Sequence, residues 1–226
     1  MLNKLINLTG EGLFVLVHSK MLDGSFKSSS LVIGLGLLVG IITRLTDFFP
    51  YDDLWSFSSI ATLFGFWMLT VTLIIYFSSS NKNAAMNVLL YLLSMNFSFY
   101  FLKYVLGFFI PRFYDEGFQW NLFILYNVIA LVCSAISYVL YYWNKENKLS
   151  NFLYALPVSG LAAETIGLSI YLYNNHTFLF QLIFDFLSLI ILGCWFYKKV
   201  NNKLIYIMTI VAVSSIVYFV VYRPFL

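Results

Sequence analysis

The sequence predicts an all-α integral membrane protein, a bundle of about seven transmembrane helices preceded by a short amphipathic N-terminal segment. Two observations predict this fold class. Of the 226 residues, 61% are hydrophobic and only 10% are charged, and the mean hydropathy of +0.85 is far above that of soluble globular domains. Apolar runs of about 20 residues, the length that crosses about 30 Å of hydrocarbon, also recur with short connections between them. We therefore expect residues 30–226 to form a single transmembrane domain.

Seven segments are apolar and long enough to be membrane spans. They lie at 31–49, 55–77, 84–110, 119–143, 152–173, 177–197 and 203–222. Two groups of three spans around a central linker helix would form parallel repeats. The two halves share no residue-level similarity, however, so an irregular bundle is the preferred expectation. Gly36 and Gly40 form a GxxxG pattern in the first span, which predicts close helix packing within the molecule more often than between molecules.

Residues 1–29 are too weakly apolar to span a membrane. Apolar residues between Leu2 and Val17 are interspersed with Lys4, Glu11 and Lys20, which predicts an amphipathic helix lying at the membrane surface. A re-entrant or docking segment is the alternative. The first span would then act as an uncleaved anchor, which favours a bacterial plasma membrane protein over a secreted one.

The distribution of lysines predicts the orientation. Nine lysines precede the first span or lie at the second, fourth and sixth loops, whereas the first and third loops carry most of the acidic loop residues. Because cytoplasmic loops are enriched in Lys and Arg, we expect the N-terminal segment inside and Arg223 outside. The same distribution explains the net charge of +3 without a nucleic-acid partner. The lipid bilayer is the expected surrounding.

Metal and cofactor sites are not predicted. The sequence has no HExxH motif, and its two histidines fall on opposite sides of the predicted membrane. Cys133 and Cys194 lie in apolar segments without a ligand spacing, so we interpret them as small core residues.

Five charged side chains lie inside the predicted spans, at Arg44, Asp47, Lys103, Glu164 and Asp185. Charge at membrane depth is rare and is usually kept for function or neutralised by a partner. With the predicted orientation and a rise of about 1.5 Å per residue, all five fall in the outer half of the membrane. We therefore expect a polar cavity that opens toward the outer face.

The neighbours of these charges extend the candidate site. Asp185 follows Gln181 by one helical turn, so both side chains project from one stripe of the helix. Lys103 stacks over Asn96, and Asn127 lies on a polar stripe of the fourth span. The predicted solute- or proton-binding residues are Arg44, Asp47, Asn96, Lys103, Asn127, Glu164, Gln181 and Asp185. The predicted cavity mouth comprises Asp52, Asp53, Trp55, Arg112 and Trp120.

Structural explanations compete with the functional one for each charge. Arg44 and Lys103 could extend their charged ends to the outer interface, and Arg44 could pair with Asp47 three residues later. Glu164 and Asp185 are harder to explain in this way, because an unpaired carboxylate at that depth could be protonated or would need a cation such as Lys103 or Arg44 to remain ionised. An interhelical salt bridge is their structural alternative.

Three functions fit this pattern, and the catalytic residues, if any, are unknown. The leading hypothesis is a permease-like protein that binds a small polar or charged solute in a cavity open to the outer face, with proton coupling as an option. The second is a membrane enzyme that acts on a lipid-linked, phosphate-containing substrate at the outer leaflet and binds its head group with basic residues. The third is a non-catalytic accessory or immunity subunit with a partner membrane subunit.

Overall fold

The computed structural model describes residues 22–111, 117–145 and 149–225, and these residues form helices and connections without a strand. Six helices are long and apolar enough to cross a membrane, which suggests a multi-pass membrane protein. They are α2 (Phe26–Thr46), α5 (Asn81–Gly107), α6 (Trp120–Leu140, continued by η2, Tyr141–Asn144), α7 (Ser150–Asn175), α8 (Leu179–Tyr197) and α9 (Lys203–Val217, continued by η3, Tyr218–Tyr222). A final turn, η4, covers Arg223–Phe225. The predicted amphipathic segment lies mostly outside the described residues.

The second predicted span, 55–77, differs from the structure because its helix is broken. A short helix, α3 (Ser59–Thr62), ends at Leu63, whose backbone is extended, and a new helix, α4 (Gly65–Phe77), begins two residues later. With 13 residues, α4 is about 20 Å long, which is shorter than the roughly 30 Å of a hydrocarbon core. A tertiary contact accompanies the break, because the N–H of Phe64 donates to a side chain of α7.

Backbone contacts at the two ends of the molecule show that the broken helix returns to the end where α2 begins. The N–H of Leu22 donates to the carbonyl of Phe77 (3.1 Å), and the N–H of Ser79 donates to that of Leu22 (3.0 Å), so α4 ends where α2 begins. At the other end, the N–H of Leu179 donates to the carbonyl of Leu54 (3.0 Å). The loop after α2 therefore meets the start of α8.

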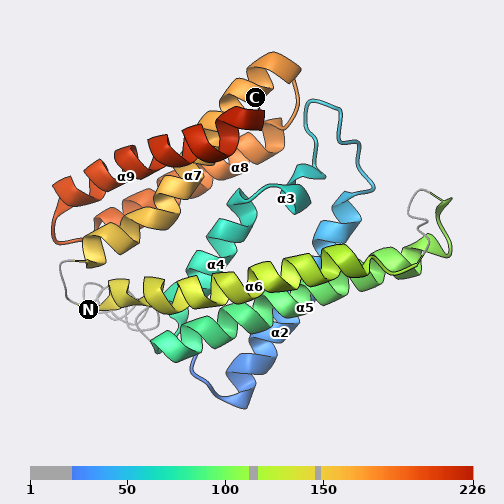
Figure 1. The fold of residues 1–226 in the computed structure, drawn as a ribbon, viewed down its shortest axis with the longest axis horizontal. Coiled ribbons are helices and arrows are strands. Elements are labelled where there is room, and N and C mark those ends of the chain that lie inside the picture. The colour runs from blue at the N-terminus through green and yellow to red at the C-terminus, as the bar shows by residue number, and fades with distance from the viewer. Residues whose placement is uncertain (1–21, 112–116, 146–148, 226) are drawn as a thin grey trace, which may run out of the picture.

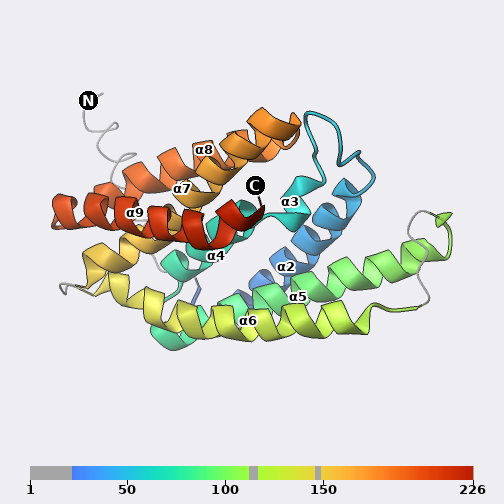
Figure 2. The same cartoon turned by 45° about the horizontal axis from the view of Figure 1, so that its top comes forward.

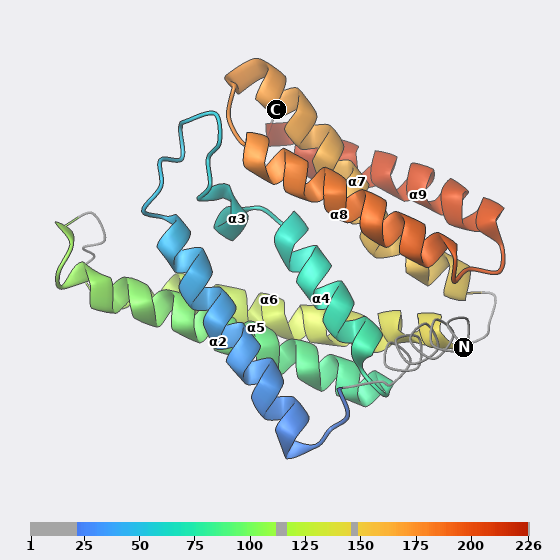
Figure 3. The same cartoon turned by 180° about the vertical axis from the view of Figure 1, so that it is seen from behind.

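The helices form two groups with α4 between them (Figures 1 and 3). In one group, α2 and α6 both pack against α5, and in the other, α8 and α9 both pack against α7. Helix α4 contacts α5 on one side and α7 and α8 on the other. Figure 2 shows the same two groups in a tilted view. Because α4 joins them, its broken start lies close to residues of α7 and α8.

The packing of α2 on α5 depends on the two glycines of the GxxxG pattern. A Cβ atom at Gly36 would overlap the carbonyl oxygen of Tyr91, and one at Gly40 would overlap that of Met95. These two backbones approach more closely than side chains would allow. The prediction of close packing within the molecule is confirmed.

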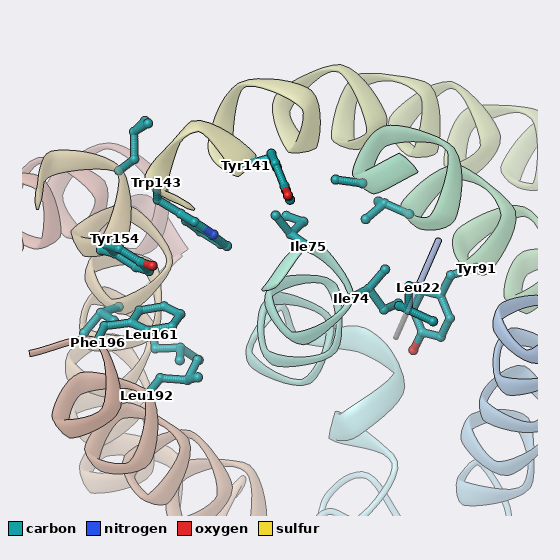
Figure 4. Packing of buried hydrophobic residues seen from close by; sticks show 14 of the residues in the cluster. Leu22, Ile74, Ile75, Tyr91, Tyr141, Trp143, Tyr154, Leu161, Leu192 and Phe196 are labelled. Carbon is teal, nitrogen blue, oxygen red and sulfur yellow. The ribbon is translucent and has the colours of Figure 1, made fainter. Parts of the chain in front are cut away.

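Helix α4 also joins two apolar clusters (Figure 4). In one, the rings of Trp143 and Tyr154 stack with centroids 5.4 Å apart, and Phe196 lies 4.9 Å from Tyr154. In the other, Leu22, Ile74 and Tyr91 lie together. Ile75 of α4 lies between the two clusters in the same core.

The outer surface is apolar, whereas several strongly polar side chains are buried. Ile124 on α6 and Val211 on α9 are 57% and 58% exposed, while Glu164, Gln181 and Asp185 are 0% exposed. Soluble proteins bury their apolar side chains and keep charged ones in water. The reversed distribution fits helices that face lipid.

Candidate functional site at a helix break

Glu164 lies in the middle of α7, fully buried, and its carboxylate contacts the start of α4. Its Oε1 atom accepts a hydrogen bond from the backbone N–H of Phe64 at 2.8 Å. The first N–H groups of a helix have no partner within that helix, and the helix dipole places partial positive charge there. Glu164 thus caps α4 from a position 100 residues further along the chain.

Asp185 reaches the same helix start from α8. It is fully buried, and its Oδ1 atom accepts a hydrogen bond from the side-chain amide of Gln181 at 2.8 Å. A Cβ atom at Gly65 would overlap this same Oδ1 atom. Glycine at this position therefore lets the carboxylate lie directly against the backbone, and the two acids meet at the Phe64–Gly65 step.

Tyr222 completes the surroundings of Glu164. Its ring packs against Gly167, one turn after Glu164 on α7, where a Cβ atom would lie 3.0 Å from the Cβ of Tyr222. Its hydroxyl lies next to the Glu164 carboxylate. Tyr222 belongs to the π-helical turn η3, a conformation that often occurs at functional sites. We call Glu164, Gln181, Asp185, Tyr222 and the Phe64–Gly65 backbone the acid site.

Three side-chain oxygens of the acid site have no hydrogen-bond partner among the described residues. They are Glu164 Oε2, Asp185 Oδ2 and Gln181 Oε1. Within the described parts of the chain, no basic side chain forms an ion pair with either acid. Because a buried acceptor without a partner is costly, an arrangement with three of them favours a site that binds something.

Arg44 and Asp47 lie elsewhere and pair with each other. Arg44 Nη1 donates to Asp47 Oδ2, and its Nε donates to the carbonyl of Phe99 at 3.3 Å. The guanidinium carbon also lies 3.7 Å from the centre of the Phe99 ring. Arg44 thus belongs to the contact between α2 and α5, and the structure places it there instead of beside Glu164 or Asp185.

The remaining predicted solute-binding residues lie on α5 and α6. The side-chain NH₂ group of Asn96 donates to Asn127 Oδ1 at 3.0 Å, and this hydrogen bond links α5 to α6. Lys103 is half-buried near the end of α5. Of the eight residues predicted for the site, the structure thus brings Glu164, Gln181 and Asp185 together at the helix break.

The predicted mouth residues fall at two places. Asp53 accepts from the N–H of Ser56 and shapes the loop after α2. In the same loop, Trp55 stacks on Phe57 and accepts from the N–H of Phe180 at the start of α8. Asp52 is exposed there.

The other predicted mouth residues belong to the connection between α5 and α6. Trp120 is exposed at the start of α6, and its ring centroid lies 4.7 Å from that of Phe118. Arg112 lies outside the described residues. The loop after α2 is therefore the part of the predicted mouth that contacts α8, the helix that carries Asp185.

Sequence reasoning missed Gly65, Phe64 and Tyr222. An isolated glycine in an otherwise apolar run is a weak signal of a break. Phe64 contributes only its backbone, and the role of Tyr222 depends on how η3 packs against α7. The described residues contain no group of three His, Cys, Asp or Glu side chains that could hold a metal ion.

No protein family model, curated protein or solved structure matches this chain. The function proposed below is therefore based on the residues of the acid site and their geometry.

Proposed function

We propose that this chain is a multi-pass permease-like protein that binds a small polar or charged solute at the acid site. The observation that carries the proposal is the meeting of two fully buried acids, Glu164 and Asp185, at the start of a broken helix. Broken helices in transporters place helix ends and unpaired backbone groups at the substrate site. Ionisable side chains at membrane depth are functional by default.

We infer that α3 and α4 together form a seventh crossing beside the six long helices. The support is the pairing of Leu22 with Ser78, which returns the chain to the end where α2 begins. The 13 residues of α4 then place the break about 20 Å from that end. This end carries the lysine-rich loops, so the acid site would lie in the outer half of the membrane, with solute entering from the outer face. A bacterial plasma membrane is the location we propose.

Proton coupling is part of the proposal. Glu164 and Asp185 come from different helices, and neither has a basic partner in the described structure. Two neighbouring carboxylates can hold one proton between them and release it when another positive charge arrives. Movement of the broken helix would then change which side of the membrane the acids face.

Transport by purified protein in proteoliposomes tests the proposed function. Charge movement on solid-supported membranes would be screened with amino acids, monosaccharides and small amines, and an internal pH dye would report proton flux. We expect at least one solute class to give a signal that falls tenfold or more in Glu164→Gln and in Asp185→Asn. Asp23→Asn is the matched control, because Asp23 lies in an exposed turn before α2. Unchanged transport and unchanged pH dependence in both site variants would contradict the proposal.

The alternative functions make different predictions. An enzyme acting on a lipid-linked phosphate needs basic side chains available to the phosphate, but the guanidinium of Arg44 is already neutralised by Asp47. An accessory subunit would copurify with a stable partner membrane protein. Activity of the isolated chain in proteoliposomes distinguishes the permease from the accessory subunit.

A further inference from the structure

We infer that the acid site binds one monovalent cation, either a metal ion or an ammonium group, through Glu164, Asp185 and Gln181. This inference deepens the proposed function and rests on it for a role in transport. The binding step itself can be measured without transport.

The first support is that the three buried side-chain oxygens without a partner in the described structure are acceptors. Glu164 Oε2, Asp185 Oδ2 and Gln181 Oε1 accept no hydrogen bond within the part of the chain that the structure describes. The orientation of the Gln181 amide follows from its hydrogen bond to Asp185, because a carboxylate oxygen accepts only from the NH₂ group. The Gln181 amide oxygen is then the atom that accepts no hydrogen bond among the described residues. An occupant must therefore donate hydrogen bonds or coordinate oxygen, as cations do and carboxylates or phosphates do not.

The second support is the charge of the site. With both acids ionised, the two carboxylates carry two negative charges, and with one proton shared between them they carry one, whereas the start of α4 offsets only about half a charge. The side chains are fully buried, so water does little to compensate the remainder. Because no basic side chain pairs with either acid in the described structure, an added positive charge would be stabilised strongly. An added anion would be repelled.

The third support is the number of ligands. Ca²⁺ takes about six to eight oxygen ligands, and Mg²⁺ takes about six with near-octahedral geometry. The acid site offers three free side-chain oxygens, with the Tyr222 hydroxyl beside Glu164. An ammonium group carries three N–H donors, which matches three acceptors. The small number of free oxygen ligands favours a monovalent occupant over a divalent one.

Thermal unfolding of the full chain in detergent tests the inference. The melting temperature would be measured in sodium, potassium, ammonium and N-methylglucamine chlorides at equal ionic strength. A ligand that binds the folded protein raises the melting temperature, and we expect at least one small cation to raise it by about 4 °C relative to bulky N-methylglucamine. Sodium or potassium would identify a metal ion as occupant, and ammonium alone would identify an ammonium group.

Variants assign any stabilisation to the acid site. Glu164→Gln keeps an acceptor for the N–H of Phe64, and Asp185→Asn keeps one for Gln181, so both are designed to fold. We expect each to lose the cation-dependent rise, whereas Asp23→Asn keeps it. Equilibrium binding of radioactive sodium or rubidium to the wild type, with ammonium as competitor, measures directly whether the protein binds a monovalent cation.

The possible results separate this inference from the proposed function. Equal melting temperatures in all four salts, together with no radioactive cation bound, would overturn the inference, whereas the proteoliposome transport would still test the permease proposal. The same measurement in calcium and magnesium chloride gives a further check, since stabilisation by these divalent cations and by none of the monovalent ones would also overturn the inference. Cation binding that depends on both acids, in a protein that transports nothing, would support the binding site and contradict the permease.

Discussion

At the scale of single residues, Gly65 allows the Asp185 carboxylate of α8 to lie directly against the backbone of α4. The Oδ1 atom of Asp185 occupies the space that a Cβ atom would take, so any larger residue must displace the carboxylate or the start of α4. Both groups are buried and packed, which leaves little room for displacement. Asp185, Glu164 and the Phe64–Gly65 backbone therefore depend on one another.

We predict that Gly65→Ala destabilises the protein and abolishes function at the acid site. Overpacking of this kind costs about 1–3 kcal/mol, and the displaced carboxylate loses its place against the backbone. Gly34→Ala is the matched control, because nothing lies within 4 Å of a Cβ atom there. Thermal unfolding in detergent would compare the two. Equal melting temperatures for both variants would show that the close contact at Gly65 is not required.

A second prediction concerns the cap that Glu164 provides. Glu164→Ala leaves the N–H of Phe64 without its acceptor, and loss of a helix cap costs about 0.5–2 kcal/mol. Glu164→Gln keeps an oxygen in place and should lose much less stability while still losing transport. Chemical unfolding of both variants measures the difference, and equal losses of stability would argue against a capping role.

Part of the acid site was predictable at this scale. Gln181 and Asp185 are four residues apart, so one helical stripe carries both, and the depth of Glu164 placed it at the same level. The partner of Arg44 was also among the expected alternatives, since Asp47 lies one turn away. Tyr222 was not predictable, because its role depends on the packing of η3 against Gly167.

At the scale of elements, the broken second helix is the main difference between expectation and structure. Residues 55–77 are apolar enough for a continuous span, and local pattern alone predicts one. At the break, Glu164 on another helix satisfies the N–H of Phe64. The local pattern contains no sign of this tertiary contact, so it could not predict the break.

The GxxxG pattern gives a prediction about the other group of helices. Gly40→Ala places a Cβ atom against the carbonyl of Met95, so α2 must move away from α5. We expect a loss of about 1–3 kcal/mol in the free energy of unfolding. Transport should be affected less than by Gly65→Ala, because Gly40 contacts α5 and the acid site is built on α4, α7 and α8. Unfolding and transport measured on both variants would show whether the two groups act independently.

At the scale of the whole molecule, the contacts between loops divide the molecule into two ends. Leu22 meets Ser78 at one end, and Leu54 meets Leu179 at the other. This division matches the alternation of lysine-rich and acidic loops along the sequence. If the lysine-rich end is cytoplasmic, the loop after α2 faces outward.

We predict opposite labelling at the two ends of the broken helix. In a chain with Cys133 and Cys194 replaced by alanine, a membrane-impermeant maleimide added to intact cells should label Asp52→Cys and should not label Lys82→Cys until the cells are opened. Labelling of both positions from outside would show that α3 and α4 do not complete a crossing. Labelling of only Lys82→Cys would invert the proposed orientation.

The sequence by itself determined the helical, apolar character of the chain, the positions of six long helices and the presence of acids within its apolar segments. These properties are local, since they follow from composition, run length and helical spacing. Only the tertiary structure decided that residues 55–77 break at Phe64, that Arg44 pairs within the other helix group, and that Glu164 and Asp185 meet without a basic partner in the described structure. The physical reason is that the capping of a helix start and the pairing of a charge depend on atoms brought close by packing, and the acceptor for Phe64 lies 100 residues away along the chain.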